Sequence, residues 1–329
     1  MITRRRVVVA LGAGALAPLA SFAQQPAKIA RIGILSSESA SDALQQSRVQ
    51  TLRDGLRSLG YNEGNNVVIE NRWAEGKYER LPDLAVELVH LKVDVIVTMG
   101  IKAAVATKRA TTTIPIVLPS TSSDVVAMGL ASSLRHPGGN FTGSAIFGPE
   151  IIAKRLELLK DALPRITRIA VLTNPANPSF GAIFDAMKVA AKSLKLALQV
   201  FEMRAMSQLN DVIKAMVKGR VDAVVVHEDT MFSVNAKLIA GTLANKRLPS
   251  AGNTEFGEAG GLIGYGVNGR EMYLGAAVLV DKILKGAKPG DLPIEQATRF
   301  DLVVNKKTAK ALGVKIPNSI LVRATKVIE

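Results

Sequence analysis

Short polar residues and glycine follow most of the apolar runs of this chain, and their positions suit the binding of a small molecule. Hydroxyl groups and the free N–H groups at the start of a helix can hold a carboxylate. A carboxylate such as Asp124 or Asp229 can in turn hold an ammonium group. The candidate ligand-binding residues are Ser36, Ser37, Thr98, Gly100, Ser122, Asp124, Asn174, His227, Asp229 and Asn253. Together they would suit a zwitterion such as an amino acid.

Several of these residues also have a purely structural interpretation. Ser, Thr, Asn and Asp at a junction between a strand and a helix commonly cap the helix, and this applies to Ser37, Thr98 and Thr230. Asp124 lies in a longer polar loop, where ligand contact and a structural role remain equal alternatives. Trp73 and Tyr78 could stack on an aromatic ligand or could pack near a strand end.

Catalytic and metal-binding patterns are weak in this sequence. The chain has no Cys, and its three His residues do not pair at metal-ligand spacing. His227, Glu228 and Asp229 could form an acid–base or metal cluster, but no partner motif accompanies them, so a role in a binding cleft or in the structure is favoured. We therefore expect no enzyme activity, no metal and no cofactor. An exported hydrolase that uses His227 and Asp229 is the less favoured alternative.

The N-terminus predicts an exported protein. Arg4, Arg5 and Arg6 precede an apolar stretch rich in Ala, Leu and Gly, and Ala23 ends a small-residue cleavage pattern. Residues 1–23 are therefore expected to be a signal peptide for the periplasm, with the general secretory and twin-arginine routes both open. The formal net charge is +14, but Lys and Arg are scattered along the chain. This distribution predicts a solvated basic surface and no nucleic-acid partner.

Strand-like apolar runs alternate with helix-period segments, which indicates parallel α/β sheets. On one predicted helix face lie Val49, Leu52, Leu56 and Leu59, and on another lie Ile152, Leu156, Leu159 and Leu163. The predicted strands are residues 29–35, 67–70, 93–98, 114–118, 168–173, 196–201, 221–226 and 262–265.

The strand pattern occurs twice in the same order. Residues 31–35 are similar to residues 168–172, residues 93–97 to residues 221–225, and residues 114–116 more weakly to residues 248–250. This repeat predicts an α/β fold of two doubly wound parallel-sheet lobes joined by a hinge, with a boundary in the Gly- and Pro-rich stretch 135–148. Open α/β sheets bind ligands at the carboxyl ends of their strands, so the site is expected between the lobes.

Many short motifs carry a family resemblance. They are residues 55–61, 72–76, 80–82, 93–97 with Gly100, 114–117, Asp124, 129–130, 133–134, 137–140 with 142–143, and 308–313 with 316–317. On these motifs, which extend over essentially all of the mature chain, it resembles the ABC transporter substrate-binding family that includes bacterial tryptophan- and other aromatic amino-acid-binding proteins. The chain departs from the family pattern at Val125, where a proline is usual after the loop aspartate.

The resemblance implies a type I periplasmic binding-protein fold with three crossings between the lobes. The first lobe would be residues 24–145 plus about 267–286, and the second residues 146–266 plus about 287–329. The implied function is capture of a small ligand, an amino acid or a related aromatic or carboxylate compound, for an ABC permease in the inner membrane. The protein is expected to be monomeric. A ligand-sensing receptor for a chemoreceptor or membrane kinase is the alternative.

Overall fold

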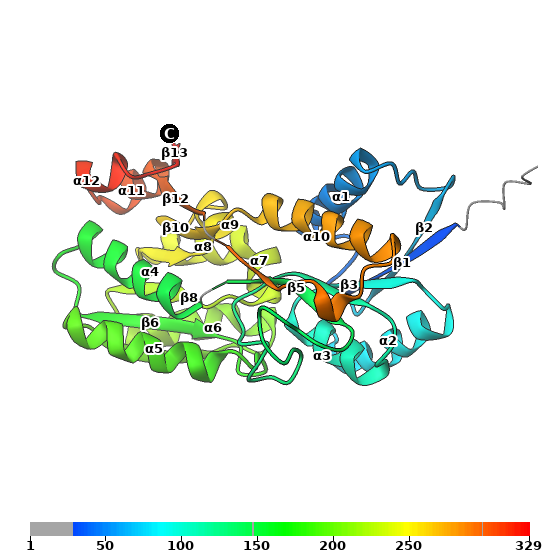
Figure 1. Cartoon of the computed structure of the whole chain (residues 1–329). Coiled ribbons are helices and arrows are strands. Elements are labelled where there is room, and N and C mark those ends of the chain that lie inside the picture. Colours follow the sequence, from blue (N-terminus) through cyan, green and yellow to red (C-terminus); the bar gives the residue numbers. More distant parts are fainter. Residues whose placement is uncertain (1–28, 147, 298) are drawn as a thin grey trace, which may run out of the picture.

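The computed structural model describes residues 29–146, 148–297 and 299–329, which form two α/β lobes side by side (Figure 1). The predicted signal peptide, residues 1–23, lies outside the described residues. Each lobe has its own central sheet, and a cavity lies where the two lobes meet.

The first sheet has six strands, all paired in parallel, in the order β11-β5-β4-β3-β1-β2. Its central strands are buried along their length because helices cover both faces, as expected for continuous β-branched runs. The strands are β1 (Ala30–Ser36), β2 (Val67–Trp73), β3 (Val95–Met99), β4 (Ile116–Thr121), β5 (Phe141–Ala145) and β11 (Glu295–Gln296).

The second sheet has seven strands in the order β13-β12-β10-β9-β8-β6-β7, and only the β10–β12 pair is antiparallel. The strands are β6 (Arg168–Thr173), β7 (Ala197–Glu202), β8 (Ala223–Val226), β9 (Ser250–Gly252), β10 (Ile263–Val267), β12 (Phe300–Asn305) and β13 (Lys326–Ile328). β6, β8 and β9 occupy the same places in this sheet as β1, β3 and β4 do in the first. The repeat predicted from sequence is therefore a structural repeat.

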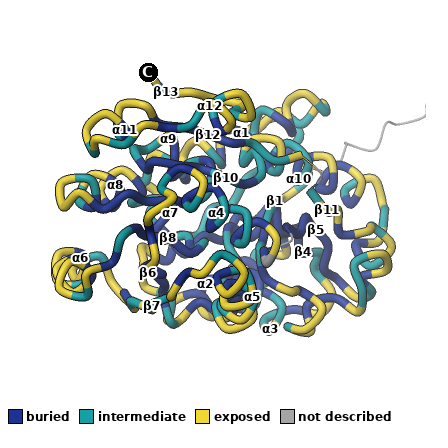
Figure 2. Tube along the Cα trace, turned by 90° about the vertical axis from the view of Figure 1, so that its left-hand side faces the viewer, coloured by how far each residue is buried: buried dark blue, intermediate teal, exposed yellow. Residues whose placement is uncertain are grey.

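Helices cover the faces of both sheets, and the tube trace shows buried strands surrounded by helices with exposed outer faces (Figure 2). The first lobe contains η1 (Tyr78–Arg80), α1 (Ala43–Ser58), α2 (Leu81–His90), α3 (Ile101–Ala110), α10 (Gly269–Leu284) and η3 (Pro289–Asp291). The second contains α4 (Gly148–Ala162), α5 (Phe180–Ser193), η2 (Met206–Gln208), α6 (Leu209–Lys218), α7 (Thr230–Val234), α8 (Ala236–Asn245), α9 (Thr254–Glu258), α11 (Lys306–Leu312) and α12 (Asn318–Leu321).

Helix α1 buries the apolar face that its sequence pattern predicts. Val49, Leu52 and Leu56 are buried in one hydrophobic cluster with strands of the first sheet and with α10. The helix ends where expected, because Gly60 adopts a φ of +95° that suits a residue just past a helix C-terminus. Gly55 lets α10 approach closely, since a Cβ atom there would lie 2.7 Å from the Cβ of Ala277.

The chain crosses between the lobes three times, but the third crossing comes later than predicted. α10 packs on α1, as expected for the first lobe. Then η3 contacts β5, and β11 pairs with β5 at the edge of the first sheet. Residues 287–296 thus lie with the first lobe, and the return to the second occurs between β11 and β12. The physical reason is the free edge of β5, which the β11 backbone covers.

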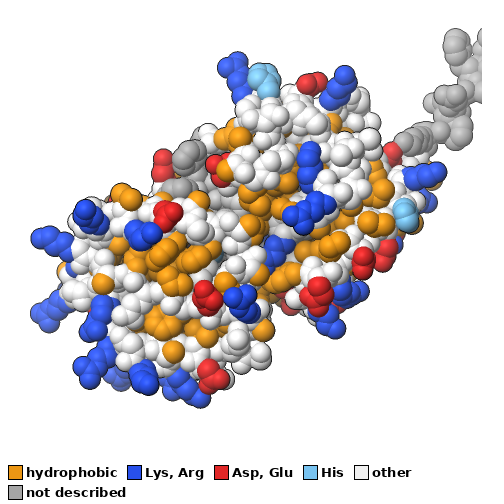
Figure 3. Space-filling model, turned by 90° about the horizontal axis from the view of Figure 1, so that it is seen from below, with side chains coloured by type: hydrophobic (Ala, Val, Ile, Leu, Met, Phe, Trp, Pro, Cys, Tyr) orange, Lys and Arg blue, Asp and Glu red, His pale blue; other side chains and the backbone are white. Residues whose placement is uncertain are grey.

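The outer surface carries mixed charge around apolar side chains. In the view from below, Lys and Arg side chains surround apolar side chains in the middle of that face, with Asp and Glu among them (Figure 3). Among the described residues, no helix combines the length and the apolar character that a membrane span requires.

Candidate functional site

A cavity of about 130 Å³ lies between the two lobes and is lined by residues from both. Five of the ten predicted site residues line it, namely Ser37, Gly100, Ser122, Asp229 and Asn253. They follow β1, β3, β4, β8 and β9 respectively, so strands from both sheets point their carboxyl ends at the same space. This is the arrangement that the doubly wound repeat predicts.

Three further predicted residues lie fully buried behind the cavity. Ser36 accepts a hydrogen bond from the backbone N–H of Glu38 (3.2 Å) and so shapes the end of β1. Thr98 is buried within β3, and its hydroxyl has no hydrogen-bond partner among the described residues. Asn174 donates weakly to the carboxylate of Asp229 (3.4 Å), so it supports a residue that does line the cavity.

The structure does not bring Asp124 to the cavity. Its side chain is exposed, and its carboxylate accepts hydrogen bonds from the backbone N–H groups of Val126 and Ala127, both at 3.0 Å. For Asp124 the structure thus supports the structural role. Trp73 also lies elsewhere, packed on the edge of the first-lobe core, whereas Tyr78 lines the cavity.

His227 does not line the cavity either. It is buried among second-lobe residues, with Phe180 against its ring at 5.4 Å between centroids and the Thr173 hydroxyl 3.3 Å from Nδ1. Burial lowers the pKa of His227 to about 4, so the ring is neutral at pH 7. Glu228 and Asp229 follow it but point to different partners, and the described residues contain no group of three acidic or His side chains able to hold a metal ion.

The N-terminus of α3 opens onto the cavity without a side-chain cap. Gly100 precedes the helix with a φ of +103°, and no side chain accepts hydrogen bonds from the first turn. Ser37, from the end of β1, lines the cavity at the same place. Free N–H groups at the start of a ten-residue helix are a good site for an anion such as a carboxylate.

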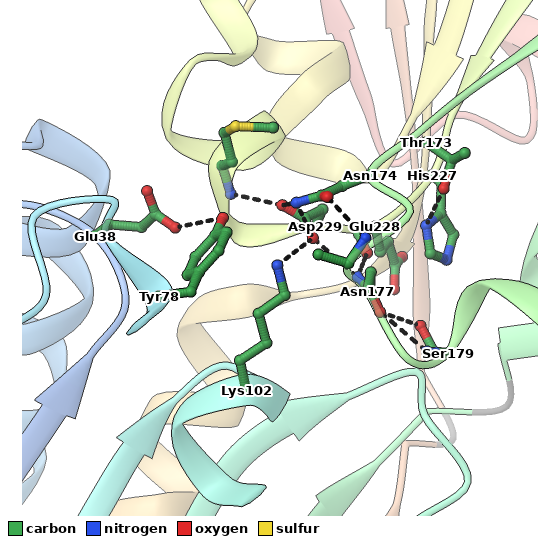
Figure 4. Close-up of polar contacts among 12 residues, drawn as sticks. Glu38, Tyr78, Lys102, Thr173, Asn174, Asn177, Ser179, His227, Glu228 and Asp229 are labelled. Atoms are coloured by element: carbon green, nitrogen blue, oxygen red, sulfur yellow. Dashed lines mark hydrogen bonds and ion pairs between the residues drawn. The ribbon is translucent and has the colours of Figure 1, made fainter. Parts of the chain in front are cut away.

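Asp229 faces this helix from the second lobe (Figure 4). Its carboxylate caps α7 through the backbone N–H of Met231 (3.0 Å) and accepts a hydrogen bond from the side-chain amide of Asn177 (3.0 Å). Asn177 also donates to the backbone carbonyl of Glu228 (2.9 Å). These contacts hold Asp229 in one orientation toward the cavity.

Lys102 and Tyr78 reach the same space from the first lobe. The Lys102 ammonium lies 3.5 Å from the centroid of the Tyr78 ring and 3.8 Å from Oδ2 of Asp229. The Tyr78 hydroxyl donates a long hydrogen bond to Glu38 (3.4 Å), whose side chain is also buried (Figure 4). Burial lowers the pKa of Lys102, and the charge of Asp229 opposes this effect.

Glu38 makes the closed cleft sensitive to pH. Burial, reinforced by the charge of Asp229 across the cleft, raises the pKa of Glu38 to about 7. Because the pKa in the folded protein is raised, the stability that Glu38 contributes is complete below about pH 4.5 and is lost as the pH rises through about 7. Glu38→Gln, which stays neutral, should therefore match the wild type near pH 4.5 and exceed it at pH 8 by up to about 3 kcal/mol.

The measurement is the free energy of unfolding of variant and wild type between pH 4.5 and 8. The difference between the two proteins cancels other titrations such as that of His227, which acts in the opposite direction. The control is Glu79→Gln, an exposed acid in η1. If the difference in the free energy of unfolding between Glu38→Gln and the wild type did not change with pH, the raised pKa of Glu38 would be contradicted.

A second contact between the lobes lies at the other end of the cavity. Arg48 of α1 forms an ion pair with Glu255 of α9 at 3.0 Å, and its guanidinium lies 5.8 Å from the centroid of the Tyr273 ring of α10. Both charged side chains are largely buried. Together with the Lys102–Asp229 contact, this pair places the two lobes in a closed arrangement.

A buried arginine supports the cavity from behind. Arg155 of α4 is only 1% exposed and forms an ion pair with Glu228 at 2.5 Å, while its Nε atom donates to the backbone carbonyl of Tyr265 in β10 (2.8 Å). Burial alone would raise the pKa of Glu228, but the charge and the hydrogen bond of Arg155, together with smaller contributions from Ser122 and His227, outweigh it and the net effect is a lowered pKa. The neighbouring Ser122 of the first lobe also lowers the pKa of Glu228. Glu228 is thus ionised in the wall of the cavity.

Comparison with known proteins identifies the family to which this chain belongs. The sequence model of the family described as ABC transporter substrate binding protein matches residues 31–328. The chain belongs to this family. This substrate-binding protein is also 26% identical over 261 residues to a protein of Clostridioides difficile named tyrosine-binding protein, a match that covers 79% of this chain and 74% of the relative.

Two solved structures resemble the whole of both lobes. An ABC domain of Streptococcus pneumoniae in complex with L-Trp matches with a TM-score of 0.83 and 26% identity, covering 91% of this chain and 99% of that one. A ligand-free, open substrate-binding protein with adhesive properties from Clostridium difficile matches with a TM-score of 0.65 and 24% identity, covering 91% and 99%. The substrate-binding protein therefore has the type I periplasmic binding-protein fold that its sequence predicts.

The cavity of this substrate-binding protein also contains residues that the sequence reasoning missed. They are Arg48, Lys102, Thr254, Glu255 and Tyr273, together with Asn177 and Ser179 after β6. Lys102, Thr254 and Glu255 lie within three residues of the ends of β3 and β9, so a wider window around Gly100 and Asn253 would have included them. Arg48 and Tyr273 lie within helices and carry no such signal.

Proposed function

We propose that this protein captures a small compound with a carboxylate group, of the amino-acid class or a related organic acid, by closing its two lobes over the ligand. The observation that carries the proposal is the uncapped N-terminus of α3 in a cavity whose opposite wall holds Asp229. Two lobes on a hinge can exchange between open and closed forms, and a ligand that contacts both lobes favours the closed form.

The relatives support this ligand class and this conformation. The names of the relative in Clostridioides difficile and of the Streptococcus pneumoniae complex both state an aromatic amino acid. The structure is also more similar to that complex than to the ligand-free open protein, as expected of a chain with closed lobes. Tyr78 and Tyr273 give the cavity two aromatic side chains for apolar contact.

The same proposal places the protein outside the cytoplasm, beside an ABC permease. Proteins of this family bind small ligands and work with a permease, and residues 1–23 have the basic and apolar sequence of an export signal. We propose cleavage after Ala23, release of a monomer into the periplasm, and capture without chemical turnover. Mass spectrometry of the exported protein would identify the new N-terminus.

The test is binding of a defined panel to the mature protein, measured by calorimetry and by the shift in melting temperature. The panel contains amino acids, aromatic and aliphatic monocarboxylates, sugars and inorganic anions. A ligand that binds only the folded state must raise the melting temperature with its concentration. We expect a shift with carboxylate compounds and none with sugars, and recovery of the ligand chemically unchanged. Binding of sugars alone, or conversion of the ligand, would contradict the proposal.

A further inference from the structure

Lys102 occupies the place in the cavity where the ammonium group of an amino acid would be expected to bind. An ammonium is attracted to the face of an aromatic ring and to a nearby carboxylate, and the cavity offers both in Tyr78 and Asp229. The Lys102 ammonium already lies against both, 3.5 Å from the ring centroid and 3.8 Å from Asp229 (Figure 4). Its side chain is only 14% exposed, so it is an internal part of the site.

The other acidic residues that line the cavity have cationic partners as well. Glu228 forms its ion pair with Arg155 at 2.5 Å, and Glu255 forms its own with Arg48 at 3.0 Å. Asp229 also accepts hydrogen bonds from Met231 and Asn177. Each of these carboxylates is therefore matched by a group of the chain itself, and the lining leaves no acid dedicated to a ligand cation.

The Lys102 ammonium still lacks an acceptor for its hydrogen bonds. Its buried Nζ atom has no hydrogen-bond partner among the described residues, and the carboxylate of Asp229 lies at 3.8 Å. A buried ammonium has three donors, and leaving them unsatisfied is costly. The cavity also contains unused donors in the first N–H groups of α3, the helix that carries Lys102. Ammonium and N–H groups thus converge on a place where a ligand carboxylate would satisfy both.

We propose that the ligand is a carboxylate without an α-amino group, an organic acid whose carboxylate pairs with Lys102 at the start of α3. This inference rests on the proposed function and narrows its ligand class. An added α-amino group would bring a second cation against Lys102 and Asp229, where the chain has already balanced the charge. The relatives named for amino acids would then differ from this chain because their ligands carry an additional positive charge, that of the α-amino group.

The test compares acids that differ only by the amino group: L-phenylalanine with 3-phenylpropionate, L-tyrosine with 3-(4-hydroxyphenyl)propionate, and L-leucine with 4-methylpentanoate. Calorimetry on the mature wild-type protein should show at least one deaminated acid binding ten times or more tightly than its amino acid. In Lys102→Met the deaminated acid should lose at least tenfold in affinity, and the amino acid should gain. Lys214→Met, which removes an exposed lysine of α6 and the same charge, should leave both affinities unchanged.

The outcomes distinguish a failure of this inference from a failure of the proposed function. Tighter binding of the amino acids by the wild type would overturn this inference and leave the proposed function intact. The inference would also be overturned if Lys102→Met left the ratio of the two affinities unchanged. If neither member of any pair binds and only sugars or inorganic anions do, the proposed function and the inference fall together.

Discussion

Replacing Arg155 by methionine is expected to lower the free energy of unfolding at pH 7 by about 3 kcal/mol. The substitution keeps the buried aliphatic volume but leaves Glu228 without its cation and the Tyr265 carbonyl without its donor. The estimate lies at the low end for a broken buried ion pair because Glu228 keeps 22% of its side-chain exposure on the cavity side. Urea unfolding at pH 7 measures the change.

Two companion variants show whether the charge of Glu228 is the cause. Arg155→Met combined with Glu228→Gln removes the uncompensated charge and should recover more than half of the lost stability. Arg204→Met breaks an exposed ion pair with Glu202 in the same lobe and should change stability by less than about 0.5 kcal/mol. If Arg155→Met were as mild as Arg204→Met, the buried pair would contribute nothing to the native state.

Replacing Gly100 by alanine is expected to weaken ligand binding by at least tenfold. A Cβ atom at this position would lie 2.8 Å from Oγ1 of Thr230 on the other lobe, closer than real Cβ contacts allow. The clash exists only when the lobes are closed, so it opposes closure by about 1–3 kcal/mol, and tenfold in affinity corresponds to about 1.4 kcal/mol. Affinity for the tightest compound of the panel and the radius of gyration in solution would report the loss of closure.

The backbone angle at Gly100 calls for a matched control. A φ of +103° strains any L-residue whether the lobes are open or closed. Gly76 also has a positive φ, +74°, but a Cβ atom there meets nothing within 4 Å. Gly76→Ala should therefore cost stability without loss of affinity. Adding Thr230→Ala to Gly100→Ala should restore part of the binding, and failure to do so would assign the effect to the backbone.

Local sequence signals determined the two lobes, and half of the ligand-binding residues predicted from them line the cavity. Apolar β-branched runs set the strands, and their recurrence in the same order gave two sheets in which β1, β3 and β4 correspond to β6, β8 and β9. Parallel strands separated by helices must place their carboxyl ends at one edge, because every strand of such a sheet runs the same way. The prediction that Gly100 and Asp229 belong near a shared cavity follows from this rule alone.

The same signals could not say which strand-end residues face the cavity. Asp124 and Asp229 both follow strands and both cap nearby N–H groups, yet Asp124 is exposed on its loop and Asp229 lines the cavity. His227 follows β8 as closely as Asp229 does, but its ring points into the second lobe. Beyond the end of a strand the regular alternation of side chains stops, and the loop conformation and packing then set the direction of each side chain. A list of polar residues does not contain that information.

The sequence by itself determined the fold class, the family and the edge of each sheet that faces the cavity. Only the tertiary structure decided which charges share the cavity. Arg48 meets Tyr273 because α10 returns to pack on α1, and Lys102 meets Asp229 because the hinge closes one lobe on the other. These pairs join positions far apart in the chain, and no periodic pattern or local spacing encodes them. Strands and helices follow from short-range patterns, whereas the balance of charge in a cleft depends on long-range packing that a single sequence does not display.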